Sequence, residues 1–67
     1  MINTEKLKGR IIEKGKTIQK LAPKCGYSAY TLGKMISNKT PMPLTVSDIL
    51  VEELNISREE IPDFFYK

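Results

Sequence analysis

Side chains that could carry out catalysis are scarce in this sequence. Its 67 residues include no histidine and a single cysteine, Cys25. Serine and cysteine nucleophiles usually depend on a histidine base, and Cys/His metal sites need several such ligands, so we expect neither kind of site. Cys25 falls on the apolar side of a helical pattern, where a core thiol is expected. The sequence therefore predicts no enzymatic activity, no metal site and no cofactor.

Side chains suited to binding another macromolecule follow in residues 28–37. Their pattern predicts a helix that begins after an N-cap at Ser28 and turns Leu32, Met35 and Ile36 inward. The outer face then consists of small, aromatic and basic side chains: Ala29, Tyr30, Gly33, Lys34 and Ser37. We expect this face to contact a partner.

A second short helix must position that face. Thr17 is suited to cap it, and Gly26 can take the left-handed conformation that ends it. Its apolar residues recur at helical spacing on one side: Ile18, Leu21, Ala22 and Cys25. Two short helices separated by three residues must cross at a steep angle, and Asn38 suits the left-handed end of the second. The sequence thus predicts a helix-turn-helix over residues 17–38.

One further helix is expected before this unit. Asn3 or Thr4 can cap a helix from Glu5 to Lys14 that Gly15 ends. Its inward residues are predicted to be Leu7, Ile11 and Ile12.

Two more helices are expected after it, beyond a loop containing Pro41 and Pro43. Thr45, paired with Asp48, is predicted to cap the fourth helix, and Ser57, paired with Glu60, a short last one. The fourth helix would bury Val46, Ile49, Leu50 and Leu54. Pro62 is expected to end or bend the last helix, and the tail to seal the core with Phe64, Phe65 and Tyr66. The prediction is one compact all-α domain of five helices over residues 1–67.

Charge is distributed unevenly along the chain. Residues 1–40 hold nine Lys and Arg against two Asp and Glu, a net charge of +7, whereas residues 41–67 hold two against six, a net charge of −4. We expect one end of the domain to face phosphate or an acidic partner and the acidic end to face away. The chain shows no signal-peptide pattern and no apolar run long enough to cross a membrane, which predicts a cytoplasmic protein.

With these elements in place, the chain resembles the lambda-repressor and Cro-like (XRE-type) helix-turn-helix family. The matching pattern comprises the capping Thr17 and, after it, Leu21, Ala22, Gly26, Tyr27, Ser28, Leu32 and Met35. The resemblance covers most of the chain and is strongest to small phage proteins of the lysogeny switch. It implies double-stranded operator DNA as a partner, with Thr17, Gln19, Asn38, Lys39 and Thr40 near the phosphate backbone.

The chain departs from the family pattern in three places. Ile18 stands where family members usually carry glutamine, so the amide of Gln19 is displaced by about 100 degrees around the helix. Pro23 lies inside the first helix of the pair and predicts a kinked or shortened helix. The outer face of the second helix offers only Lys34, with weaker help from Tyr30 and Thr31, for hydrogen bonds to base edges.

Two hypotheses follow. In the first, a phage-type transcriptional regulator inserts residues 28–37 into the major groove. The base edges would then be met by Ala29, Tyr30, Thr31 and Lys34, and Ser28, at the start of this helix, belongs to the same binding surface. A second copy or a second protein would supply the rest of the binding. In the second, an antirepressor or modulator uses the same surface to bind the DNA-binding domain of a phage repressor, alone or in a joint complex on DNA. Tyrosine is favoured in such protein interfaces.

Overall fold

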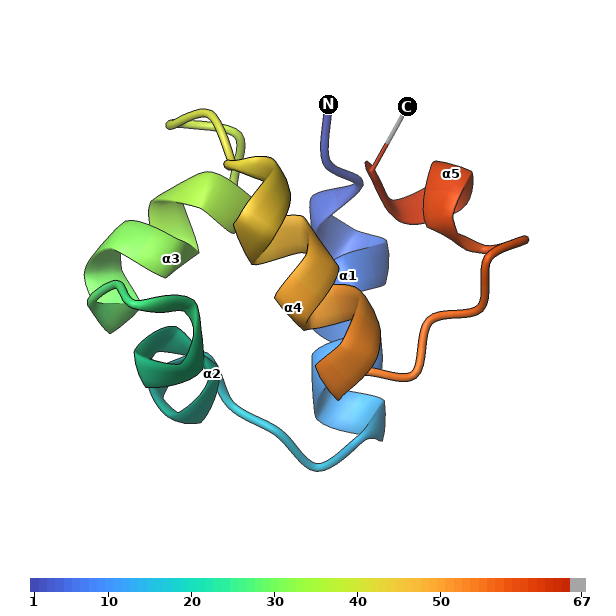
Figure 1. The fold of residues 1–67 in the computed structure, drawn as a ribbon, viewed down its shortest axis with the longest axis horizontal. Helices are drawn as coiled ribbons and strands as arrows, with labels where there is room; N and C mark the ends of the chain where they lie inside the picture. The colour runs from blue at the N-terminus through green and yellow to red at the C-terminus, as the bar shows by residue number, and fades with distance from the viewer. Residues whose placement is uncertain (66–67) are drawn as a thin grey trace.

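The structure is a computed structural model that describes residues 1–65. Within that range it is all-helical, as the sequence predicts. The five helices are α1 (Thr4–Glu13), α2 (Ile18–Cys25), α3 (Ala29–Ile36), α4 (Leu44–Glu53) and α5 (Ile61–Phe65). Figure 1 shows α2 and α3 together on one side of the molecule, α5 on the other and α4 crossing between them. The first residues of the chain lie near α5.

A single apolar core joins all five helices. Its fully buried side chains include Leu7 of α1, Leu21 of α2, Leu32 of α3, Leu50 of α4 and Phe64 of α5. Domains of this size have little interior, so each helix must contribute its apolar face. Burial of Phe64 and Phe65 confirms that the tail helps to seal the core; Tyr66 lies outside the described residues.

The predicted caps of the first three helices are present. Asn3, Thr17 and Ser28 each accept a hydrogen bond from the backbone N–H three residues later. This bond satisfies one of the free N–H groups at a helix start. Gly26 (φ 80°) and Asn38 (φ 65°) adopt the left-handed conformation expected at the ends of α2 and α3. These local features fix where both helices begin and end.

The prediction that Ile12 faces inward is wrong. Its side chain is 76% exposed, whereas Leu7 and Ile11 are buried. Leu7 and Ile11 are four residues apart and so lie on one face of α1, and Ile12 is turned by about 100 degrees from that line. The helix also begins one residue earlier than predicted, at Thr4, and ends at Glu13.

The predicted cap of the fourth helix is also wrong. The helix begins at Leu44, and Thr45 lies inside it; its N-cap is Pro43, which forms no side-chain capping bond. Pro43 has extended backbone angles, and its carbonyl oxygen accepts hydrogen bonds from the N–H groups of Val46 and Ser47. Of the apolar residues predicted inward on this helix, Val46, Leu50 and Leu54 are buried and Ile49 is partly buried.

The last helix and α2 both contain a proline, and the one in the last helix differs from expectation. Glu60 accepts a bond from the Ser57 N–H as predicted, but α5 begins only at Ile61. Pro62 therefore lies in the first turn, where a missing N–H leaves no bond unmade, and it does not end the helix. Helix α2 likewise continues through Pro23 to Cys25.

Candidate macromolecule-binding surface

Helices α2 and α3 form the frame of the candidate surface. They pack on each other, and the connection between them spans only residues 26–28. The N–H groups of Gly26 and Tyr27 donate to carbonyls at the end of α2, to Pro23 and Ala22 respectively, which closes the helix. The short, fully bonded turn holds α3 in a fixed direction relative to α2.

The outer face of α3 presents an aromatic and a cationic side chain side by side. Tyr30 is 76% exposed, and the Nζ atom of Lys34 lies 5.2 Å from the centre of its ring. That distance is within the range of a cation–π contact, which holds the two side chains together on the surface. Ser28 donates its hydroxyl proton to Thr31 Oγ1 at 3.0 Å and accepts from the Thr31 N–H at 3.1 Å. Thr31 Oγ1 therefore accepts one bond within the chain and keeps its own hydroxyl proton and a second lone pair for a partner.

The start of α2 lies beside this face. Thr17 Oγ1 accepts from the Lys20 N–H at 3.2 Å, and Gln19 is exposed. Thr17 and Gln19 line a hollow together with Ala29 and Tyr30. The structure therefore brings the predicted residues of α2 and those of α3 onto one surface.

The loop after α3 places Asn38 differently from expectation. Its Oδ1 atom accepts from the Ile2 N–H at 2.8 Å, and its Nδ2 atom donates to the Ile2 carbonyl at 2.8 Å. The amide predicted to contact phosphate is therefore engaged with the start of the chain. Lys39 is exposed and Thr40 is partly exposed. Both border a separate hollow beside Asn38.

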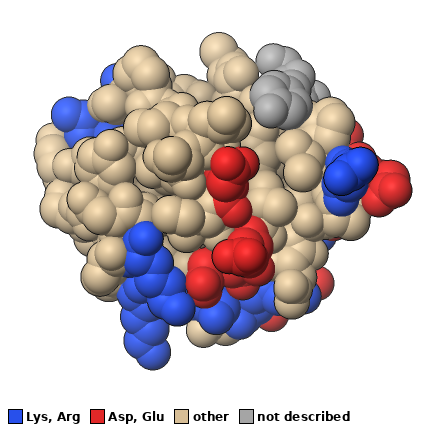
Figure 2. Space-filling model, viewed as in Figure 1, with Lys and Arg blue, Asp and Glu red and all other residues tan. Residues whose placement is uncertain are grey.

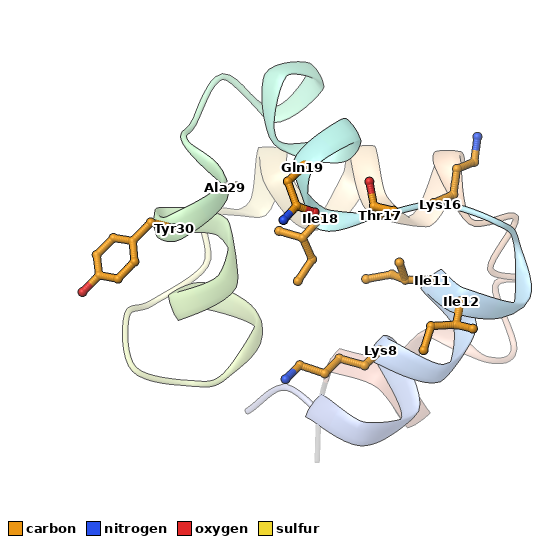
Figure 3. Close-up of a pocket in the computed structure, with 9 residues that line it drawn as sticks. All are labelled: Lys8, Ile11, Ile12, Lys16, Thr17, Ile18, Gln19, Ala29 and Tyr30. Carbon is orange, nitrogen blue, oxygen red and sulfur yellow. The ribbon is translucent and has the colours of Figure 1, made fainter.

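A trough runs between α1 and α3, and we call it the α1–α3 trough. It consists of two adjoining hollows that share Lys8, Ile18, Ala29 and Tyr30. Figure 3 shows Ile11 and Ile12 reaching into the first hollow from α1 and Ile18 from the start of α2, while the Tyr30 ring points away from it. The remaining lining residues are Lys16, Thr17 and Gln19 at one end and Gly33, Lys34, Ser37 and Lys39 at the other.

Lys8 and Ile12 of this trough were not among the predicted binding residues: Lys8 was expected to face outward as a solvated lysine, and Ile12 to face inward. They are four residues apart on α1 and hence neighbours on one helix face. The burial of Leu7 and Ile11, also four apart, directs that face outward. The i, i+4 spacing groups Lys8 with Ile12, but it does not say which of two consecutive isoleucines faces inward.

Ion pairs divide the basic residues into two groups. Carboxylates of the acidic half approach Lys6 (Asp63, 3.7 Å), Arg10 (Glu60, 2.8 Å), and both Lys16 and Lys24 (Glu53, 3.7 and 3.3 Å). Within residues 1–65, the lysines without a carboxylate partner are Lys8, Lys14, Lys20, Lys34 and Lys39. Three of these, Lys8, Lys34 and Lys39, line the α1–α3 trough.

The acidic residues gather elsewhere. Figure 2 shows them across the middle of the view, over α4, with basic side chains along the lower edge. The contacts of Glu53 with Lys16 and Lys24 tie α4 to the start and end of α2. Ion pairs with the acidic half therefore partly neutralise one side of the domain. The lysines that line the α1–α3 trough have no such partner within residues 1–65, so the edge of the trough stays positive.

Three titratable groups have shifted pKa values. The hydrogen bond with Glu60 raises the pKa of the Arg10 guanidinium. The Arg10 guanidinium, and then the Ser57 backbone N–H, lower the pKa of Glu60 from 4.5 to about 2. Burial, and then the nearby charge of Glu53, raises the pKa of the Cys25 thiol. A high pKa keeps the thiol protonated and weakly nucleophilic, which suits its place in the core.

Comparisons were made with family models, curated proteins and solved structures. None of them matches the chain. Membership of the lambda-repressor-like family accordingly stays a prediction. Across residues 1–65, no helix has the length and apolar character needed to span a membrane, and acidic and cysteine side chains form no cluster suited to a metal ion.

Proposed function

We propose that the chain is a lambda-repressor-like helix-turn-helix domain that binds double-stranded DNA as a small regulator of a phage-type genetic switch. One observation carries this proposal: Lys34 and Lys39, at the outer end of α3, have no carboxylate partner within residues 1–65. Cations left free beside an exposed helix are suited to phosphate, and they supply most of the affinity of non-specific DNA binding.

The arrangement of helices supports the same function. Helix α3 would enter the major groove with Tyr30, Thr31 and Lys34 toward base edges. Thr17 and Gln19 would contact one stretch of the DNA phosphate backbone, and Lys39 would contact the neighbouring stretch. Because so few of these groups read bases, a second copy or a second protein would supply the rest of the specificity.

Salt dependence tests DNA binding without knowledge of the operator. A labelled duplex of mixed sequence is titrated with the protein at several salt concentrations between about 50 and 200 mM, and log affinity should fall by about 0.9 per decade of salt for each phosphate contacted. Lys34→Gln and Lys39→Gln should each reduce that slope by about 1. Lys24→Gln is the matched control, because Lys24 lies 3.3 Å from Glu53 and has its charge neutralised there. A slope that is flat in salt, or equally reduced by all three changes, would contradict the proposal.

A second candidate function is favoured by Tyr30. Tyrosine is enriched in protein interfaces, and the exposed Tyr30 suits an antirepressor or modulator that binds a phage repressor's DNA-binding domain. Calorimetry with that domain and with operator DNA separates the two functions. Tyr30→Ala and Lys34→Glu should weaken repressor binding, and unchanged binding would exclude this surface.

A further inference from the structure

Ile12 is an exposed apolar side chain that takes no part in the core formed by residues 1–65. Its side chain is 76% exposed at the edge of the α1–α3 trough, and the core is complete without it. Ile18 and Ala29 continue the apolar floor, and both are only partly buried. Adjoining apolar side chains left in contact with water are typical of a site that another molecule covers.

The charge of the trough indicates what kind of molecule could cover it. Lys8 lines both hollows, Lys16 lies at one end, and Lys34 and Lys39 lie at the other. No carboxylate of residues 1–65 lines either hollow, although Asp and Glu are frequent in the chain. The surface is therefore complementary to a ligand that is apolar on one side and acidic at its edges.

We propose that the α1–α3 trough binds an acidic amphipathic helix of a protein partner. Two helices form its walls, and a groove of this kind accepts a third helix through apolar side chains spaced three and four residues apart. These side chains would cover Ile12 and Ile18, and flanking glutamates would meet Lys8 and Lys34. DNA fits less well, because the apolar floor offers phosphate no hydrogen bond.

This inference goes beyond DNA binding and does not depend on it. The trough shares several residues with the surface proposed to contact DNA, namely Thr17, Gln19, Tyr30, Lys34 and Lys39. A helix bound in the trough would therefore compete with DNA for those side chains, so the partner would act as a regulator of DNA binding.

The test uses a designed peptide as the probe. A fluorescein-labelled peptide of about 18 residues, or five helical turns, carries leucines on one face and glutamates on the other. A scrambled peptide of the same composition carries the same charge without an apolar face. Fluorescence anisotropy should show saturable binding of the first peptide and much weaker binding of the second, with NMR shift changes at Ile12, Ile18 and Tyr30.

Matched variants locate the site. Ile12→Ser should weaken peptide binding about tenfold, because one isoleucine side chain is no longer buried. Leu44→Ser is the control, since Leu44 is similarly exposed, at 67%, but lies on α4 outside the trough. Both changes are at the surface, and circular dichroism checks that both variants fold.

Four results would overturn the inference. These are absence of saturable binding at millimolar peptide, equal binding of the scrambled peptide, no effect of Ile12→Ser, and equal effects of Ile12→Ser and Leu44→Ser. If Ile12→Ser instead weakens duplex DNA binding by the same factor, the trough belongs to a nucleic-acid surface. A failed DNA titration alone leaves the peptide measurement intact, so failures of the two proposals can be distinguished.

Discussion

At the scale of single residues, Asn38 combines two roles. Its backbone has a φ of 65°, which ends α3, and its side-chain amide forms two hydrogen bonds of 2.8 Å with the backbone of Ile2. The nearby hydroxyl of Thr4 donates to the Ile36 carbonyl, so the first residues of the chain are fastened to the end of α3. Asn55 has a similar φ of 52°. Within residues 1–65 its side chain forms no such bond to a distant part of the chain.

We expect Asn38→Gly to lower the free energy of unfolding by about 1 kcal/mol, because glycine keeps the left-handed conformation but loses the exposed bonds to Ile2. Asn55→Gly is the matched control and should change the free energy of unfolding by less than about 0.5 kcal/mol. Urea denaturation measures this free energy for both variants. Equal losses in the two variants would show that the contact with Ile2 does not stabilise the fold.

At the scale of the elements, α2 is helical despite an unfavourable residue. Pro23 lies in its interior and lacks the N–H that would bond to the preceding turn. Caps at Thr17 and Gly26 and packing against α3 and α4 outweigh this loss. Packing of an apolar face stabilises most short helices in proteins, which explains why the helix is not shortened.

Replacing this proline should therefore stabilise the protein. Pro23→Ala restores the missing bond and should raise the free energy of unfolding by about 2 kcal/mol, less than the full penalty of an interior proline because proline also restricts the unfolded chain. In a domain of this size that corresponds to an increase in Tm of about 10 °C.

Pro62→Ala provides the control, because Pro62 lies in the first turn of α5, where no N–H is required. Thermal unfolding followed by circular dichroism should show a higher Tm for Pro23→Ala and an unchanged Tm for Pro62→Ala. An unchanged Tm for Pro23→Ala would mean that the restored backbone hydrogen bond does not stabilise α2.

At the scale of the whole molecule, the acidic half of the chain folds back onto the basic half. Asn3 donates its N–H to the Phe64 carbonyl at 2.8 Å, and Arg10 on α1 forms paired hydrogen bonds with Glu60 before α5. These contacts hold the start of the chain against the region of α5, as Figure 1 shows. Because these acidic residues neutralise basic residues of α1, the positive side of the domain is the side of the α1–α3 trough.

The contact between Arg10 and Glu60 predicts a dependence of stability on pH. Because the folded-state pKa of Glu60 is lowered from 4.5 to about 2, its contribution is present above pH 4.5 and is lost as the pH falls toward 2. Glu60→Gln should therefore lower the urea midpoint at neutral pH, and the difference from the natural sequence should disappear in acid.

Glu59→Gln is the neighbouring control and should show no such pH-dependent difference, because Glu59 is exposed and has no ion pair within residues 1–65. A difference for Glu60→Gln that stays constant from neutral pH to pH 2 would show that the ion pair is not its source.

The candidate surface was only partly predictable. Helical spacing correctly grouped Tyr30 and Lys34 on the outside of α3, and Thr17 and Gln19 lie beside them as expected. The trough was missed because Ile12 was assigned to the core. Which of two consecutive isoleucines faces inward depends on the helices packed against α1, and a single helical pattern does not contain that information.

The sequence by itself determined the all-helical character of residues 1–65, the caps at Thr17 and Ser28, and the left-handed positions of Gly26 and Asn38, and it narrowed the first cap to Asn3 or Thr4. Each of these depends on bonds or backbone preferences within about four residues, so the local sequence is sufficient to specify them. Tertiary structure alone decided the outward direction of Ile12, the bonds of Asn38 to Ile2 and the pairing of Arg10 with Glu60. Those features join residues that are distant in the chain, or depend on them, and they form only when the helices pack around a common core.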